Sequence, residues 1–372
     1  MNLPQSTMSK GSNMSVSAPL EHQQLTISQE FPTKEWANVT SPEKYGLSAE
    51  VRERVDAMLD GLSTTSFMAV AAGKALYTYG DVSEVSYLAS TRKSILSMLF
   101  GKAVAEGKID LDLTMADLNI DEDHGLLPIE KTATLRNLLI SSSGVYHQPG
   151  SPGSNTKNIP ERGSKKPGDY FHYNNWDFNV LGAAFEQLTG RSVFEAFEED
   201  FAGPMGLQDF DPSRQRMMGY DGASRYLAYH FFLSGRDMAR LGLSMVRNGR
   251  WGDEQIIPAD WVAESTRIRV PAGKMNESEK SRIAGYSYLW WIPVVTKDTP
   301  EWDGAFVAAG HFGQFILGMP ALDMVLVNRR AIPDDLAIAR NDGSFKEELP
   351  AVTMEQFLSV ADQLITAKLS VR

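Results

Sequence analysis

The residues best suited to chemistry begin with a Ser-x-x-Lys motif, Ser90-Thr91-Arg92-Lys93. The apolar residues that follow recur with helical spacing, so Ser90 and Lys93 are expected on one face of a helix, one turn apart. A serine hydroxyl is a poor nucleophile until a neighbouring group takes its proton. A lysine can take that proton when burial or nearby cations lower its pKa. The motif is therefore compatible with Ser90 as a nucleophile and Lys93 as its proton acceptor.

A purely structural role is the alternative for both residues. Ser90 would then be a helix N-cap and Lys93 a solvated helix lysine, and the motif alone does not decide between these roles. Two further copies of the motif begin at Ser41 and Ser154, but neither opens a comparable helical pattern. Ser41 precedes a proline, and Ser154 lies in a long stretch rich in Gly, Pro and Ser, residues 148–168.

Tyr173-Asn174-Asn175 is the only Tyr-x-Asn motif among the twelve tyrosines. It comes just before a segment with helical periodicity, residues 178–188, which ends at Gly190. Tyr173 is placed to relay protons, and Asn175 to bind a substrate carbonyl or to hold the lysine of the first motif. The alternative is that Asn175 caps the helix and Tyr173 packs against the core.

His311-Phe312-Gly313-Gln314 lies between two expected strands, residues 305–309 and 314–319. Gly313 lets a substrate backbone approach a strand closely. The amide of Gln314 is a candidate donor to an oxyanion. The alternative is a turn at a strand edge that holds an incidental histidine.

The elements that must position these motifs come from both ends of the chain. Helices are expected over residues 49–62, from Ser90 to about residue 104, and over 178–188, 236–246 and 353–368. Strands are expected over residues 67–72, 75–79, 286–293, 305–309, 314–319 and 324–328. We therefore predict an α+β protein, with an antiparallel sheet flanked by helices and a mainly helical second domain.

This pattern also predicts the division of the chain into domains. Residues 1–40 are polar and without periodicity, so we expect a loosely held, flexible N-terminal arm. Residues 41–88 and 265–372 form the expected sheet domain. Residues 89–264 form the expected mainly helical domain.

Composition excludes several classes of partner and cofactor. A net charge of −11 argues against nucleic acid and acidic membrane surfaces as partners. The absence of cysteine excludes disulfides and thiolate catalysis. No metal or other cofactor is expected, because the chain has no HExxH, GxGxxG or P-loop motif. The oligomeric state is not indicated.

The hydrophobic pattern also gives an expectation for localisation. No apolar stretch approaches the ~18 residues of a membrane-spanning helix, and the first residues show no signal-peptide pattern. We therefore expect a cytoplasmic protein. The alternative is a periplasmic or secreted protein whose signal has been removed.

Taken in this order, the three motifs resemble the family of class C serine β-lactamases, DD-peptidases and related esterases. Flanking stretches such as "KSILSMLFGKAVAEGKIDLDLTMADL", "YNNWDFNVLGAAFEQLTG" and "SGRDMARLGLSMVRNGRWGDEQIIPADWV" resemble blocks of that family. The resemblance runs from about residue 47 to residue 365. It implies a mixed sheet domain and a helical domain, with the active site in the groove between them.

The resemblance also implies roles for individual residues. Ser90 would be acylated, and Lys93 and Tyr173 would remove its proton and later activate water. The amides of Ser90 and Gln314 would form the oxyanion hole, and Asn175 would orient the lysine and the substrate. His311, Phe312 and Gly313 would line the substrate strand. Aromatic residues beside the motifs are expected to line an apolar pocket, with core packing as the alternative: Tyr146, Trp176, Trp290 and Trp291.

One departure from the family pattern bears on the substrate. The third motif begins with His311, where β-lactamases have a lysine that helps to hold the substrate carboxylate. A mostly neutral histidine would hold a carboxylate less well. Together with the missing signal pattern, this favours a serine hydrolase of a small-molecule ester or amide, related to carboxylesterases, D-amino-acid amidases and 6-aminohexanoate-dimer hydrolases. The alternatives are a β-lactamase or DD-peptidase, and a non-catalytic binding or scaffold relative.

Overall fold

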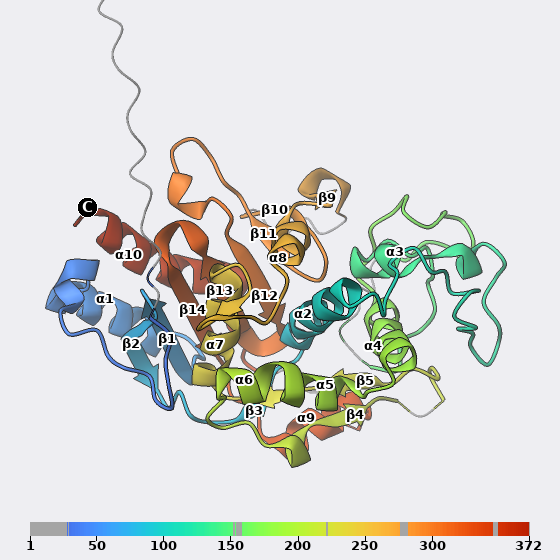
Figure 1. The fold of residues 1–372 in the computed structure, drawn as a ribbon, viewed down its shortest axis with the longest axis horizontal. Helices are drawn as coiled ribbons and strands as arrows, with labels where there is room; N and C mark the ends of the chain where they lie inside the picture. Colours follow the sequence, from blue (N-terminus) through green and yellow to red (C-terminus); the bar gives the residue numbers. More distant parts are fainter. Residues whose placement is uncertain are drawn as a thin grey trace, which may run out of the picture.

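An antiparallel sheet of eight strands forms the centre of the computed structural model (Figure 1). The structure describes residues 28, 30–151, 153, 158–220, 222–275, 282–344 and 349–371. The strands of the sheet are β1 (Ser66–Ala71), β2 (Lys74–Gly80), β9 (Val270–Pro271), β10 (Ile283–Tyr286), β11 (Trp291–Pro293), β12 (Phe306–Gly310), β13 (Gln314–Met319) and β14 (Met324–Arg329). Their order across the sheet is β2-β1-β14-β13-β12-β11-β10-β9, and all neighbours are antiparallel.

Both ends of the chain contribute to this sheet. The hairpin of β1 and β2 pairs with β14 in a register that runs from Ser66 opposite Arg329 to Ala71 opposite Met324. Strand β14 in turn continues the sheet through β13 and β12. The predicted α+β class, with an antiparallel sheet flanked by helices, is therefore confirmed.

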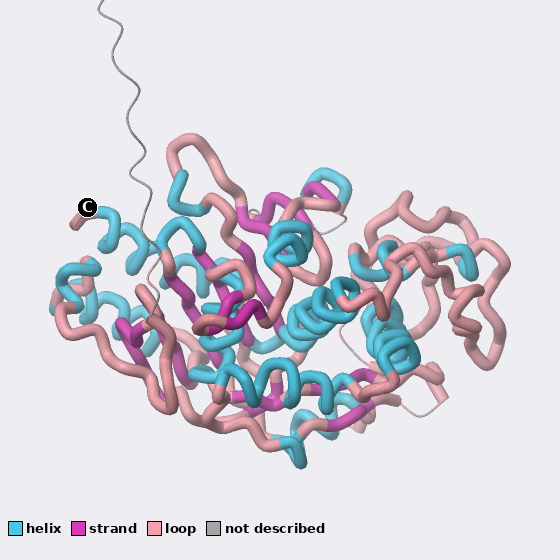
Figure 2. The backbone as a smooth tube through the Cα atoms, viewed as in Figure 1, coloured by secondary structure: helices cyan, strands magenta, loops and turns pink. Residues whose placement is uncertain are grey.

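The remaining elements are helices and short strands. The helices are α1 (Ala49–Asp60), α2 (Thr91–Ala105), α3 (Leu135–Leu139), α4 (Asn175–Thr189), α5 (Val193–Phe197), α6 (Gly203–Met205), α7 (Gly235–Val246), α8 (Ala259–Thr266), α9 (Asp334–Asn341) and α10 (Met354–Leu369). The short strands are β3 (Ser86–Tyr87), β4 (Arg216–Met218), β5 (Ala228–His230), β6 (Phe232–Leu233), β7 (Arg250–Trp251) and β8 (Glu254–Gln255). Loops make up much of the molecule around α3 and α4 (Figure 2). Among the described residues, no helix is both long and apolar enough to cross a bilayer.

Alternating side chains give the sheet two buried faces. On β14, Met324 and Leu326 pack in a core with α1 and α10. The residues between and after them, Val325 and Val327, belong to the core that includes α2, α4 and α7. Because successive strand residues point to opposite sides, a continuous apolar run is required where both faces are covered by helices.

Local sequence signals explain several of the helix boundaries. Ser48 caps α1 by accepting a hydrogen bond from the amide of Val51. Thr353 and Gln356 form a reciprocal capping box at the start of α10. Gly190 ends α4 in the left-handed conformation, as the sequence predicts.

One expected strand is wrong as a single element. Residues 286–293 form the end of β10 and the whole of β11, separated by a tight turn. In this turn the amide of Ser287 donates to the carbonyl of Trp290 at 2.9 Å, and Leu289 has a φ of 66°. The turn itself, residues 287–290, has none of the Gly, Pro or Asn residues that usually mark one, so the sequence pattern does not reveal it.

The described part of the expected arm is attached to the molecule. The buried Arg240 on α7 donates to the carbonyls of Thr33 and Lys34, at 3.0 and 3.1 Å. Val39 donates to the carbonyl of Ala75 at the edge of β2. Within residues 30–40, hydrogen bonds to the backbone therefore attach this segment to α7 and β2. Most of residues 1–29 lie outside the described part of the chain.

Helix α7 lies against one face of the sheet. Gly242 on α7 approaches the sheet so closely that an added Cβ would lie 2.6 Å from a methyl group of Val325 and 2.8 Å from one of Ile316. The helix therefore packs directly on β13 and β14. An amphipathic pattern predicts that a helix is buried on one side, but not which layer it covers.

Candidate active site

Ser90 lies at the start of α2, directly after a strained turn. The preceding residue, Ala89, has a φ of 48°, which a non-glycine residue rarely adopts. Ser90 occupies the N-cap position of α2, but its side chain makes no capping hydrogen bond. Its Oγ instead accepts a hydrogen bond from Lys93 Nζ at 2.9 Å. The capping role considered above therefore does not explain the serine.

Lys93 is buried between two helices and makes contact with two hydroxyl groups. Its side chain is only 2% exposed. Besides Ser90 Oγ, its Nζ reaches Tyr173 Oη at 2.6 Å. The same nitrogen lies 4.2 Å from the ring centres of both Tyr173 and Phe178. Lys93 is therefore not a solvated helix lysine, and the first two motifs meet at one point.

The third motif is tethered to the same end of α2. Thr91 Oγ1 donates to the carbonyl of Gln314 at 2.8 Å. An added Cβ on Gly310 would lie 2.4 Å from the carbonyl oxygen of Leu88 and 2.9 Å from Thr91 Oγ1. The close contact between β12 and this turn therefore requires glycine. It places the amides of Ser90 and Gln314 on adjoining segments of backbone.

The turn between β12 and β13 has an unusual backbone. It is the short 3-10 segment η7 (His311–Gly313), in which Phe312 has a φ of 68° and Gly313 a φ of 106°. An added Cβ on Gly313 would lie 2.7 Å from the Cβ of Val352. The positive φ is costly at Phe312, whereas Gly313 adopts it readily, so packing must hold Phe312 in this turn.

His311 is exposed at this turn, and its ring lies 4.2 Å from that of Phe312. Partial enclosure of the ring and the nearby positive charge of Arg340 lower the pKa of His311 from 6.5 to about 4. The histidine is therefore neutral at pH 7. Arg340 on α9 lies over the ring of Phe312, with its guanidinium carbon 5.0 Å from the ring centre.

The side chain of Asn174 holds the second motif against the backbone of the loop at residues 145–147. Asn174, not Asn175, caps α4, because its Oδ1 accepts a hydrogen bond from the amide of Trp176 at 3.2 Å. The amide group of Asn174 also donates to the carbonyls of Val145 and His147. Asn175 is the first residue of α4 and is buried.

Two of the four candidate aromatic residues lie near the motifs. The ring centre of Trp291 is 5.6 Å from that of Tyr173, so Trp291 packs against the tyrosine of the second motif. Tyr146 packs edge-on against His172 at 5.5 Å, and burial raises the pKa of its hydroxyl. The side chain of Trp290, in contrast, packs against Phe306 in the core.

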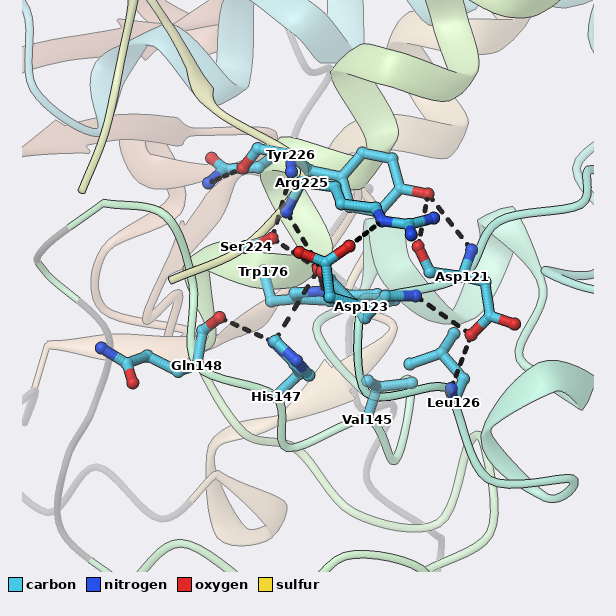
Figure 3. A network of polar contacts seen from close by, with 12 residues as sticks. Asp121, Asp123, Leu126, Val145, His147, Gln148, Trp176, Ser224, Arg225 and Tyr226 are labelled. Atoms are coloured by element: carbon cyan, nitrogen blue, oxygen red, sulfur yellow. Dashed lines mark hydrogen bonds and ion pairs between the residues drawn. The ribbon is translucent and has the colours of Figure 1, made fainter. Parts of the chain in front are cut away.

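Trp176 is fully buried, and a polar network holds its indole (Figure 3). Its Nε1 donates to the buried carboxylate of Glu122 at 2.7 Å. Glu122 also accepts hydrogen bonds from Ser224 Oγ and from the amide of Arg225. This placement corresponds to the packing role and not to a pocket wall. The network joins three loops around the start of α4.

Sequence reasoning missed some residues that shape this site. Thr91, Arg92 and Asn174 lie inside the first two motifs, and the pattern treats them as variable positions. Arg92 has one available signal, since it is a helix arginine with no acidic residue three or four positions away. The competing motif at Ser41 precedes a short 3-10 segment, η1 (Pro42–Tyr45). The copy that begins at Ser154 lies outside the described residues.

Comparison with known proteins places this chain in a family. The family model described as "Beta-lactamase" matches residues 51–337. The chain therefore belongs to the β-lactamase family, whose fold it shares with penicillin-binding proteins. No curated protein matches the sequence significantly.

Solved structures show the same fold at low sequence identity. A protein from Bacillus anthracis described as a 6-aminohexanoate-dimer hydrolase is 21% identical, with a TM-score of 0.59 over 85% of this chain and 81% of its own. One from Bacteroides dorei described as a β-lactamase is 18% identical, with a TM-score of 0.60 over 86% and 98%. EstCE1, a hydrolase with promiscuous acyltransferase activity, is 14% identical, with a TM-score of 0.58 over 88% and 100%.

Proposed function

We propose that this protein is a serine hydrolase that cleaves a small ester or amide through an acyl-enzyme on Ser90. The observation that carries this proposal is the buried Lys93 Nζ, which lies within hydrogen-bond distance of both Ser90 Oγ and Tyr173 Oη. A nucleophile and its proton acceptors must be within about 2.6–3.2 Å of one another. Family membership supports the same chemistry.

In the first half of the proposed reaction, Ser90 Oγ attacks the carbonyl carbon of the substrate. Its proton passes to Lys93 or Tyr173, and from there to the leaving alcohol or amine. The amides of Ser90 and Gln314 donate hydrogen bonds to the oxyanion that forms. In the second half, water attacks the acyl-enzyme, loses its proton to the same groups, and Ser90 regains its hydrogen.

The neutral His311 supports an uncharged ester or amide as the substrate. A carboxylate beside the scissile bond gains little from a neutral imidazole, whereas a charged donor would strengthen the contact by about 1.5–3 kcal/mol. The structural relatives include a protein described as a 6-aminohexanoate-dimer hydrolase and a hydrolase with promiscuous acyltransferase activity. The same comparisons include β-lactamases and penicillin-binding proteins, so cleavage of β-lactams is the second candidate activity.

The test combines active-site labelling with a substrate panel. A fluorophosphonate should add mass to the peptide that contains Ser90, and Ser90→Ala should abolish both labelling and turnover. The panel should contain p-nitrophenyl esters, D-amino-acid amides, 6-aminohexanoate dimer and nitrocefin. Labelling of a different serine would contradict the mechanism. Failure to react with every probe would favour a non-catalytic binding protein.

A further inference from the structure

Glu122 holds a buried carboxylate at the start of α4, and the reaction above does not use it. Its side chain is 1% exposed. Its Oε1 accepts hydrogen bonds from Trp176 Nε1 at 2.7 Å and from Ser224 Oγ, and its Oε2 accepts the amide of Arg225 at 3.1 Å (Figure 3). Burying a carboxylate is costly unless donors satisfy its oxygens. Here the donors come from two segments, so Glu122 joins the first turn of α4 to the loop that carries Ser224.

The same loop holds α4 at a second point. The amide of Tyr226 donates to Ser224 Oγ at 3.1 Å, and the carbonyl of Tyr226 accepts a hydrogen bond from Asn179 Nδ2 on α4 at 3.2 Å. The ring of Tyr226 also packs edge-on against Trp176, with the ring centres 6.3 Å apart. Glu122 therefore holds the first turn of α4 directly and the second turn through this loop.

The place of Tyr173 depends on where α4 begins. Tyr173 lies three residues before Trp176, and Asn174 between them caps the helix by accepting the amide of Trp176 at 3.2 Å. The ring of Tyr173 packs against Phe178 on α4, with the ring centres 4.9 Å apart. Its Oη lies 2.6 Å from the Nζ of Lys93, which belongs to α2. A shift of α4 relative to α2 would therefore change the distance between these two atoms.

We propose that Glu122 is a positioning residue, which holds the start of α4 so that the hydroxyl of Tyr173 stays within hydrogen-bond distance of Lys93. This inference rests on the proposed function, in which Tyr173 and Lys93 move the proton of Ser90. Proton transfer requires this geometry, and a misplacement of about 1 Å can cost about a hundredfold in rate. Glu122 acts through Trp176 and α4, and not by contact with the substrate.

The first experiment measures kcat and KM for a p-nitrophenyl ester in Glu122→Leu, which removes every acceptor of the network. We expect kcat to fall by about ten- to a hundredfold. KM should change much less, because the residues expected to line the substrate stay in place. Glu122→Gln keeps an oxygen for Trp176 and Ser224 and loses only the hydrogen bond from the amide of Arg225. This conservative variant should therefore restore most of kcat.

The decisive measurement repeats Glu122→Leu in a Tyr173→Phe background. If Glu122 acts by placing the hydroxyl of Tyr173, its removal costs little in a protein that lacks this hydroxyl. The losses in kcat from the two changes should therefore not multiply, as is typical of residues that act through one another. A loss in the Tyr173→Phe background as large as that in the wild type would overturn the inference, because it would mark Glu122 as structural only.

Trp176→Phe takes the place of Glu122→Leu if the latter does not fold. It keeps an aromatic ring and removes the donor to Glu122, so it should lower kcat in the same way. Trp261→Phe is the matched control, because it replaces another buried indole, on α8, whose Nε1 has no hydrogen-bond partner among the described residues. Its kcat should not change. Equal losses of kcat in the two variants would overturn the inference.

The outcomes separate this inference from the proposed function. An unchanged kcat in Glu122→Leu, or in Trp176→Phe where that variant replaces it, overturns the role of Glu122. Labelling at Ser90 and a low kcat in Tyr173→Phe would then still support the hydrolase. Full activity in Ser90→Ala would instead remove the proposed function, and with it the basis of the inference.

Discussion

At the scale of single residues, the contacts of Lys93 explain how one side chain can serve both halves of a hydrolysis. It touches the hydroxyl of Ser90 on its own helix and that of Tyr173, which lies 80 positions away. Aromatic rings of Tyr173 and Phe178 enclose the same nitrogen. Their enclosure removes water that would otherwise solvate the ammonium form.

The first prediction concerns the proton pathway. Lys93→Ala and Tyr173→Phe should each lower kcat by at least about a hundredfold, the usual contribution of a general acid or base. KM should change much less, because neither change removes the strand that lines the substrate. Steady-state kinetics with a p-nitrophenyl ester measures both constants. Near-wild-type kcat in both variants would show that the proton takes another route.

The second prediction concerns His311 and charge selectivity. His311→Lys should raise nitrocefin turnover relative to ester turnover by several-fold to about a hundredfold, since each ~1.4 kcal/mol is tenfold. The reason is that a lysine at this turn adds the positive charge that the neutral histidine lacks. His124→Lys adds the same charge at another exposed position and is the control. An equal ratio in the two variants would show that His311 does not set the preference.

The lowered pKa of His311 also predicts how this selectivity depends on pH. The group is neutral above its folded pKa and gains charge only as the pH falls toward about 4. The ratio of nitrocefin to ester turnover in the wild type should therefore stay flat between about pH 6 and 8. An unperturbed histidine, with a pKa of about 6.5, would make the ratio rise as the pH falls through that range. Parallel pH profiles for the two substrates measure the difference.

At the scale of elements, the site depends on contact between the start of α2 and the end of β12. Thr91 binds the carbonyl of Gln314 across 223 positions of sequence. Gly310 makes the approach possible, and its φ of −125° is ordinary for any residue. The glycine is therefore needed for space and not for its backbone conformation.

The third prediction tests this contact. Gly310→Ala should separate α2 from β12, because the new methyl group would meet the carbonyl of Leu88 at 2.4 Å. Overpacking of this kind costs about 1–3 kcal/mol, and we expect kcat/KM to fall because the amides of Ser90 and Gln314 move apart. Gly273→Ala, where an added Cβ meets nothing within 4 Å, is the control. Unchanged activity in Gly310→Ala would exclude a tight requirement for this contact.

At the scale of the whole molecule, the sheet joins the first and last thirds of the chain. Strands from residues 66–80 pair with strands from the last third, and the helices that carry Ser90 and Tyr173 lie between them in sequence. The segment before α1 adds a further connection through Arg240, which also binds the carbonyl of Met205 at 2.7 Å. One buried guanidinium therefore joins the beginning of the described chain to α7 and to the end of α6.

The fourth prediction concerns this connection. Arg240→Met should lower the free energy of unfolding by about 3 kcal/mol or more, because several carbonyls lose a charged donor at once. The activity of the folded fraction should remain unchanged, since Arg240 lies outside the proposed site. Thermal unfolding and specific activity measure the two effects. Arg250→Met, at an exposed position, should change neither. Loss of activity without loss of stability would show that Arg240 affects the site.

Much of the fold could be predicted from the sequence because its signals are local. The helical periodicity of residues 49–62 and the strand patterns of residues 67–72 and 75–79 depend on neighbours close in the sequence. The order of the three motifs indicated a covalent hydrolase through its resemblance to the β-lactamase family. Spacing within a helix placed Ser90 and Lys93 on one face.

Only the tertiary structure decided which of these side chains are buried and what they touch. Burial of Lys93, Arg92 and Trp176 depends on segments far away in sequence, which no local pattern records. The sequence left open whether Lys93 is solvated, and the tertiary structure places it against Tyr173. It also shows a turn at Leu289 and an attached segment over residues 30–40. Periodicity shows which side of a helix or strand is apolar. The strength of interactions between charged side chains depends instead on which other segments cover that side.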